Sequence, residues 1–358
     1  MSAWKYKRIM PKIAVAKLKI MEPKEITNLA GMSLHHISSI LEKTPYKAEI
    51  SEIRTELTAN SLEDALLKNF INTCEELMEM SPKRIRLLLS TFLMKFEADC
   101  VKAILRAKKA ELDMDEAMRY IMPVGRLDEA RCRKILEISE NIADVAESLS
   151  DMEYGSVLEK AFAVYEEEKV FYLLEVDIDR HVYSKIWRTI GKLGGLDKKI
   201  ARTVIGLEID SANVKTILRC KAMGISEGQI RRYLIPVSEV FGEKELEEVI
   251  RESDIHSFIN SLVRLARDAM SRDYQYIFTE IQKQNVTSLT TLEKLLDRGL
   301  IETSLRMIKR YTPYFNIGLL LAFLNLKWFE VRNLRTIMRG TESGIPPDTI
   351  KKMLLLPR

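Results

Sequence analysis

Hydrophobic residues recur every three or four positions through most of this 358-residue chain, the spacing that puts them on one face of an α-helix. Residues 245–250 and 305–309 show the pattern clearly. The chain has only 14 Gly and 10 Pro, and no Asn-Gly or Asp-Gly pair that would favour a β-hairpin turn. The pattern therefore predicts an all-α protein with long helices.

One helical segment occurs three times. Phe96–Arg106 returns as Ile209–Arg219 and again as Phe329–Arg339, each with an acid at its second position and an Ile-x-Arg ending. We call these the signature segments. The first two are 113 residues apart and the last two 120, so three copies of about 119 residues would fill the chain. Such internal periodicity indicates one supersecondary unit used three times.

Other landmarks repeat with the signature segments. A Leu-Glu pair precedes each of them, and a proline follows, at Pro123, Pro236 and Pro357. Each repeat is predicted to end in a signature helix, a turn of about six residues, a second short helix and a proline stop. Capping boxes at Asp113 and Ser226, and Pro346-Pro347 in the third copy, mark the start of that short helix. The predicted repeats are residues 1–125, 126–237 and 238–358.

An acid lies on the apolar face of every signature helix. At 100° per residue, Glu97 shares a face with Val101 and Ile104, whereas Lys102 and Arg106 point roughly the opposite way. Asp210 and Glu330 obey the same geometry. Because burying an unpaired carboxylate costs several kcal/mol, all three acids need a cationic or N–H partner, or must face a polar interior.

Two interpretations of these acids remain open at this point. In one, each acid pairs with an arginine of a neighbouring helix and only fixes packing. In the other, the three copies arrange equivalent polar residues around a shared axis and line a socket for a protein partner. The opposite face, with Lys102, Lys215 and Arg335, is interpreted as a solvated helix surface.

Composition and motifs exclude several functional classes. Lys and Arg exceed Asp and Glu only by 56 to 52, too even a balance for a nucleic-acid-binding face. The four cysteines form no CxxC pair, so we expect reduced, buried thiols and neither a zinc nor a redox site. The four histidines lack metal-ligand spacing, and Gly191-Lys192 lacks the rest of a phosphate-binding loop. We therefore predict no catalytic, cofactor or metal site, and protein partners.

Neither a secretory signal nor a membrane span is expected. The N-terminus has no apolar run, and the best candidate span, residues 314–326, is uncharged for 13 residues whereas a spanning helix needs about 20. That segment is predicted to be a buried core helix. Any membrane association would then go through a partner or the protein surface.

The three-copy layout resembles the family of archaeal-type ATP synthase C subunits, relatives of the d subunit of vacuolar ATPases. The match includes the Leu41-x-x-Thr44-x-Tyr46 element and the final Phe329-Glu330-x-x-Asn333-Leu334-Arg335-x-Ile337-x-Arg339-Gly340, and it spans essentially the whole sequence. One departure is Cys100, which takes the place of Asn213 and Asn333.

The resemblance implies a funnel-shaped, all-helical protein of three pseudo-equivalent domains, peripheral to the cytoplasmic face of the cell membrane. Its socket would receive the central stalk and its other end would meet the membrane proteolipid ring, so that the protein transmits torque without catalysis. The candidate partner-interface or socket-shaping residues are Glu97, Arg106, Asp210, Arg219, Glu330, Arg335 and Arg339. A helical-repeat scaffold for an unrelated partner, or a helical enzyme with carboxylates converging from separate repeats, are the alternatives.

Overall fold

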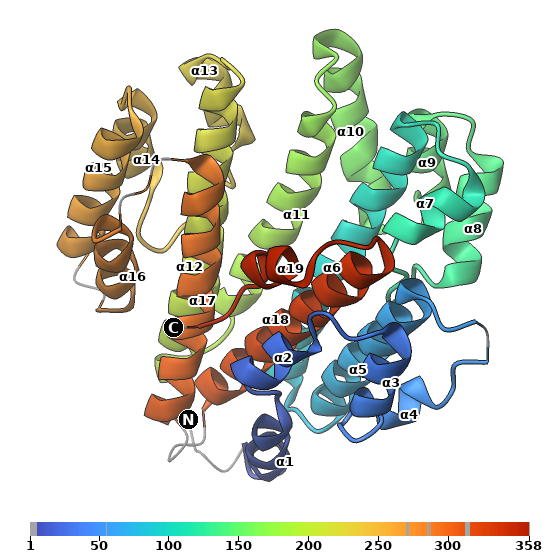
Figure 1. The fold of residues 1–358 in the computed structure, drawn as a ribbon. Coiled ribbons are helices and arrows are strands. Elements are labelled where there is room, and N and C mark those ends of the chain that lie inside the picture. Colours follow the sequence, from blue (N-terminus) through green and yellow to red (C-terminus); the bar gives the residue numbers. More distant parts are fainter. Residues whose placement is uncertain are drawn as a thin grey trace. The chain divides into compact units, whose positions relative to one another are not determined.

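The computed structural model describes residues 6–54, 56–269, 272–284, 286, 288–311 and 316–357, without the side chains of residues 168 and 173. Within these residues every regular element is a helix, and the sole β feature is an isolated bridge between Val124 and Leu127 (Figure 1). The all-α prediction is thus confirmed.

The helices follow one another with short connections. In chain order they are α1 (Ile9–Ala16), η2 (Lys17–Lys19), α2 (Pro23–Leu29), α3 (Leu34–Leu41), α4 (Lys47–Ile50), α5 (Ala59–Glu79), α6 (Lys83–Lys109), α7 (Met114–Tyr120), α8 (Glu129–Ile138), α9 (Ile142–Ser148), α10 (Glu153–Glu168), α11 (Tyr172–Gly191), α12 (Gly195–Ala222), α13 (Glu227–Ile230), η3 (Arg231–Tyr233), α14 (Glu243–Arg251), α15 (Ile255–Asp268), α16 (Arg272–Gln282), α17 (Leu289–Tyr311), α18 (Ile317–Glu342) and α19 (Pro347–Met353).

The chain forms two compact units. The first consists mainly of Asp179–Asn325, and the second of Lys5–Ile178 together with Leu326–Leu354. The unit boundaries fall inside α11 and α18, not at the ends of the sequence repeats. The three repeats at 1–125, 126–237 and 238–358 describe sequence equivalence, which this division does not test, and they stay a prediction.

The three signature segments form long helices, as predicted. They lie in α6, α12 and α18, and each helix is followed by a short helical segment: α7, α13 with η3, and α19. The connecting turns cover residues 110–113, 223–226 and 343–346, four residues each and shorter than the predicted six. Gly224 and Gly344 have φ of +71° and +67°, a left-handed conformation that glycine adopts without steric cost.

The capping predictions are partly wrong. Asp113 caps α7 by accepting a hydrogen bond from Glu116 N at 2.8 Å, but Glu116 does not reach back. Ser226 occupies the N-cap position of α13, yet its hydroxyl binds the Gln229 side chain instead of a backbone N–H. The start positions were therefore correct, and the reciprocal bonding was not.

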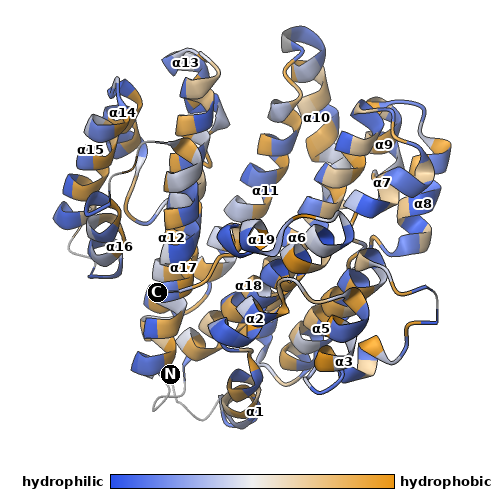
Figure 2. Ribbon diagram, in the orientation of Figure 1, coloured by the Kyte–Doolittle hydropathy of each residue, from blue (hydrophilic) through white to orange (hydrophobic). Residues whose placement is uncertain are grey.

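Amphipathic helices bury their apolar faces. Figure 2 shows hydrophobic and hydrophilic residues sharing most helices. From Ile317 to Leu326, α18 is buried throughout, which confirms the predicted core segment apart from residues 314 and 315, which lie outside the described part. In the residues that the structure describes, no helix combines the length and hydrophobicity needed to span a bilayer.

An asparagine on α12 ties the signature helix to the chain beyond η3. The Asn213 amide nitrogen donates to Ile235 O at 3.1 Å, and Ile235 N donates to Asn213 Oδ1 at 2.8 Å, with Asn213 fully buried. Cys100 cannot make these bonds. Its Sγ instead lies 3.6 Å from Cys132 Sγ, and the Cys132 thiol donates to Leu127 O. All four cysteines are free and buried, as expected.

We predict that Asn213→Ala destabilises the protein by about 2–4 kcal/mol, because it leaves the N–H and C=O of Ile235 buried without partners. Cys100→Ala removes a small side chain but leaves no backbone N–H or C=O without a partner. The loss in free energy of unfolding should therefore be smaller than for Asn213→Ala. Chemical denaturation of both variants measures the difference, and equal losses would contradict this role for Asn213.

Candidate functional site

The Glu330 carboxylate on α18 is bound by residues from the start of the chain. Met21 N donates to its Oε1 and the Tyr46 hydroxyl to its Oε2, each at 2.6 Å. Lys327 Nζ lies 3.5 Å from Oε2 and 3.7 Å from the centre of the Tyr46 ring. Burial and the nearby Glu330 charge raise the pKa of Tyr46, so the phenol stays protonated and remains a donor.

The Asp210 carboxylate on α12 has an equivalent environment. Its Oδ2 accepts from Val240 N at 3.0 Å, Phe241 N at 3.5 Å and the Tyr274 hydroxyl at 2.8 Å. Asp210 has no solvent exposure, and its Oδ1 lacks a hydrogen-bond partner in the described chain. Burial raises the pKa of Asp210 to about 7, although the three donors act in the opposite direction.

The Glu97 carboxylate on α6 completes the set. Arg126 N donates to its Oε1 at 3.2 Å, and the Tyr154 hydroxyl lies 3.5 Å from Oε2 while also donating to Met94 O. Gly125 has φ of +58°, and a Cβ there would collide with Glu97 Oε1. Only glycine fits this turn, because a side chain would displace the carboxylate.

We call these three arrangements the carboxylate clasps. In each, an acid of one predicted repeat accepts from a loop N–H of the next, and a tyrosine hydroxyl of that next repeat lies beside the carboxylate: Glu97 with the second, Asp210 with the third, Glu330 with the first. Tyr274 and Tyr46 donate to their acids, whereas Tyr154 donates to Met94 O. No arginine side chain is among the donors in the described residues, so the pairing with arginines was wrong. The acids do have the N–H partners that burial requires.

The arginines that end the signature segments form ion pairs that also link each predicted repeat to the next. Arg106 donates to Glu175 through Nε at 2.5 Å and Nη2 at 2.7 Å, and Arg219 Nε donates to Glu293 at 2.6 Å. Arg339 binds Glu63 through Nε at 2.6 Å and Nη2 at 3.0 Å. Glu63 and Glu293 belong to the repeated Leu-Glu pairs. In the second predicted repeat the arginine is bound by Glu175, and not by Glu159 of the Leu-Glu pair.

The face that was interpreted as solvated is partly occupied by ion pairs. Lys102 binds Asp99 at 2.8 Å, Lys215 binds Asp297, and Arg335 Nε lies 3.1 Å from Glu63 Oε2. The three cationic side chains are 12%, 20% and 33% exposed. They are half-buried side chains held in place, so the interpretation as plain helix surface was wrong.

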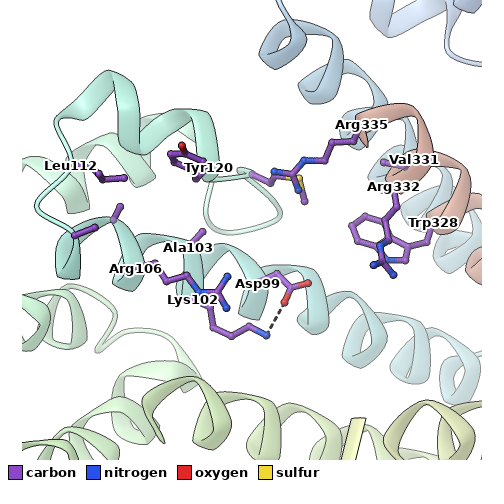
Figure 3. A pocket seen from close by; sticks show the side chains of 13 residues that line it. Asp99, Lys102, Ala103, Arg106, Leu112, Tyr120, Trp328, Val331, Arg332 and Arg335 are labelled. Atoms are coloured by element: carbon purple, nitrogen blue, oxygen red, sulfur yellow. Dashed lines mark ion pairs between the residues drawn. The ribbon is translucent and has the colours of Figure 1, made fainter. Parts of the chain in front are cut away.

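A cavity of about 580 Å³ opens between α6 and the part of α18 in the same unit (Figure 3). We call it the α6–α18 groove. Its lining includes one acid, Asp99, and four cations: Lys102, Arg106, Arg332 and Arg335. No grouping of three or more His, Cys, Asp or Glu side chains suited to a metal ion occurs in the described chain.

The seven candidate residues thus belong to two kinds of contact, the carboxylate clasps and the arginine–carboxylate ion pairs. Glu97, Asp210 and Glu330 lie in the clasps, and Arg106, Arg219, Arg335 and Arg339 lie in the ion pairs. Arg106 and Arg335 also line the groove. Sequence reasoning missed the clasp tyrosines, although Tyr46 stood in the Leu41-x-x-Thr44-x-Tyr46 element. Tyr154 and Tyr274 have no constant spacing that would have identified them.

Known proteins are similar to this chain along nearly its whole length. Residues 9–353 match the ATP synthase (C/AC39) subunit family. The chain belongs to this family. Its relatives include the A-type ATP synthase C subunit of Methanothermobacter thermautotrophicus, 28% identical over 82% of this chain and 74% of the relative. The C subunits of Methanocaldococcus jannaschii and Haloferax volcanii are 23% and 25% identical, over 98% and 97% of this chain and 86% and 97% of theirs.

Family membership confirms the resemblance drawn from the three-copy layout. The match extends over all three signature segments and all three clasps. The clasps and ion pairs are therefore features of a chain that matches the C/AC39 family along nearly its whole length.

We predict that the stability of the wild-type protein relative to Asp210→Asn falls as pH rises from about 4 to about 7. Because the pKa of Asp210 is 3.8 unfolded and about 7 folded, the native state holds the proton more tightly across this range. The difference in free energy of unfolding between the two proteins should stop changing above pH 7, after a total change of at most about 4 kcal/mol. Urea unfolding at a series of pH values measures it, and a parallel pH dependence in both proteins would contradict a buried carboxyl.

We predict that Arg339→Met destabilises the protein by about 1–3 kcal/mol, because Glu63, only 3% exposed, loses its two-pronged partner and keeps Arg335 alone. Glu63→Gln should remove most of that cost. A double-mutant cycle from denaturation measures the coupling, and independent effects of the two changes would rule the pairing out.

Proposed function

We propose that this chain is a non-catalytic rotor component of an A-type or V-type rotary ATP synthase. In this proposal it joins the central stalk to the membrane proteolipid ring at the cytoplasmic face of the cell membrane. It transmits torque between them during proton- or sodium-coupled ATP synthesis or hydrolysis. The observation that carries the proposal is the family match over residues 9–353, with relatives named as C subunits of A-type ATP synthases.

The clasps supply a physical reason why such a body could bear a mechanical load. A coupling must resist shear between its parts. Each predicted repeat is bound to the next by a clasp carboxylate, buried in the case of Asp210 and Glu330, and by an arginine–carboxylate pair. Separating the contacts of Glu330 or Glu63, each only 3% exposed, would leave a buried carboxylate without these partners, at a cost of several kcal/mol. Repeat-to-repeat contacts of this kind favour stiffness over bending.

The proposal assigns different roles to the candidate residues. Glu97, Asp210 and Glu330 are already bound within the chain, so they form a supporting shell and do not reach a partner themselves. Arg106 and Arg219 have side chains 61% and 50% exposed and can contribute to a socket surface. The funnel shape and central socket are part of this proposal.

A helical-repeat scaffold that binds an unrelated partner would have the same internal contacts. It would have no affinity for stalk or ring proteins. Binding to both parts of the rotor distinguishes the two functions.

We predict that ATP hydrolysis becomes coupled to ion movement only when this chain is present. The test reconstitutes the catalytic head, central stalk and purified ring in vesicles, with and without the chain, and measures ATP hydrolysis together with ion uptake. The reason is that torque cannot pass between stalk and ring without a connecting protein.

A second arm uses Tyr46→Phe with Tyr274→Phe, which removes one donor from each of two clasps. If these clasps stiffen the coupling, this double variant should still bind but transport fewer ions per ATP hydrolysed. Ion transport that is equally coupled to hydrolysis without the chain would refute the function.

A further inference from the structure

Two cysteines that are far apart in the sequence bring their thiols into contact. Cys100 lies on α6 and Cys132 on α8, two helices that pack against each other (Figure 1). Their Sγ atoms are 3.6 Å apart, and both thiols are free. No redox pair was expected from the sequence, because the two cysteines lack CxxC spacing. Only the packing of α8 on α6 reveals the pair.

The contact between Cys100 and Cys132 is close to the geometry of a disulfide. Because a disulfide holds its sulfur atoms about 2 Å apart, the two Sγ atoms must approach each other by about 1.5 Å. Rotation of the two side chains can supply this approach when the helices already pack together. No third His, Cys, Asp or Glu joins the pair as a metal ligand in the described chain. Oxidation is therefore the chemistry that the pair favours.

The cysteine pair lies at the junction between the first and second predicted repeats. Cys100 is nearly one turn along α6 from Glu97, and the Cys132 thiol donates to Leu127 O at 3.4 Å. Leu127 directly follows Arg126, whose backbone N–H donates to Glu97. A bond between the two sulfurs would therefore close covalently the junction that the Glu97 clasp holds by hydrogen bonds.

This junction has the longest tyrosine contact of the three clasps. Tyr154 lies 3.5 Å from Glu97 and donates to a backbone carbonyl, whereas tyrosines donate to Asp210 and Glu330 at 2.8 and 2.6 Å. Cys100 also takes the place of the asparagine that ties α12 to the chain beyond η3. A covalent link would thus reinforce the junction that has the weaker polar contacts.

We propose that Cys100 and Cys132 form a modification site, at which a peroxide oxidises the two thiols to a disulfide that crosslinks α6 to α8. The thiolate of one cysteine attacks a peroxide oxygen, so that an S–O bond forms, the O–O bond breaks and hydroxide leaves. The second thiol then attacks the sulfenic sulfur, so that the S–S bond forms and water leaves. The sulfurs lose two electrons, and the hydrogen peroxide that accepts them ends as water together with the two thiol protons.

Burial makes this modification slow. The two side chains are 1% and 0% exposed. The hydrogen bond with Cys132, together with burial, raises the pKa of the Cys100 thiol well above its usual value, so that little thiolate is present. Peroxide therefore reaches the sulfurs during local opening of the packing between α6 and α8. The same burial shields the finished disulfide from reductants, so the crosslink persists after it forms.

Peroxide treatment of the full-length chain tests the site. Cys100→Ala removes one member of the pair, and the matched controls Cys74→Ala and Cys220→Ala each remove another buried thiol and leave the pair intact. Each protein is incubated with a small excess of hydrogen peroxide, in native buffer and in dilute urea that promotes local opening. Free thiols are then alkylated, and unreduced peptides are mapped by mass spectrometry. Circular dichroism checks that every variant is folded.

We expect a disulfide-linked peptide pair that carries Cys100 and Cys132 in wild type and in both controls, and its loss on treatment with dithiothreitol. Hydrogen exchange at the Arg126 N–H should slow several-fold in the oxidised protein, because the crosslink restrains the turn that binds Glu97. The midpoint of thermal unfolding should rise by a few degrees. Cys100→Ala, treated in the same way, should show none of these changes and controls for methionine oxidation.

Three results would overturn the proposal. One is a pair that stays reduced in both buffers, and another is oxidation of either cysteine to a sulfinic acid without a link. The third is a link that forms while hydrogen exchange and thermal unfolding stay unchanged, since the disulfide would then not reinforce the junction. Neither the stalk nor the ring takes part in the experiment, so its result does not depend on the proposed function.

Discussion

A carboxylate on the apolar face of a helix must find hydrogen-bond donors, and this chain meets that constraint three times. Glu97, Asp210 and Glu330 each lie on a signature helix beside hydrophobic residues; Asp210 and Glu330 are buried from water, and Glu97 is half-buried. Their donors are loop N–H groups of the following predicted repeat and, for Asp210 and Glu330, tyrosine hydroxyls of that repeat. The interaction that satisfies each acid therefore also joins two segments far apart in the sequence.

Periodicity predicted the parts of the fold that depend on helix geometry. The signature helices, the short helices after them and the buried segment of α18 all follow from apolar spacing and from proline and glycine positions. The donors to the acids could not be predicted in this way. Val240 and Met21 contribute backbone N–H groups, which every residue type except proline has, so the sequence holds no signal for them.

The long-range ion pairs of the signature arginines were not predicted from the sequence. Glu63 and Glu293 belong to the repeated Leu-Glu pairs and bind signature arginines, although sequence alone did not show that they meet. The second repeat breaks the rule, since Glu175 replaces Glu159 in this role. Cys100 is a second irregularity, and the first repeat lacks the amide bonds that Asn213 makes to Ile235. A contact can thus be kept by a residue at another position, as Glu175 shows, even where the aligned residue of the repeat does not make it.

These contacts give the proposed rotor role a physical basis, because torque must cross from one repeat to another without bending the body between them. The most direct test is electron cryomicroscopy of the assembled rotary complex that contains this chain. We expect the chain to lie between the end of the central stalk and the membrane ring. Density for the chain on a peripheral stalk, or away from the ring, would contradict the rotor role.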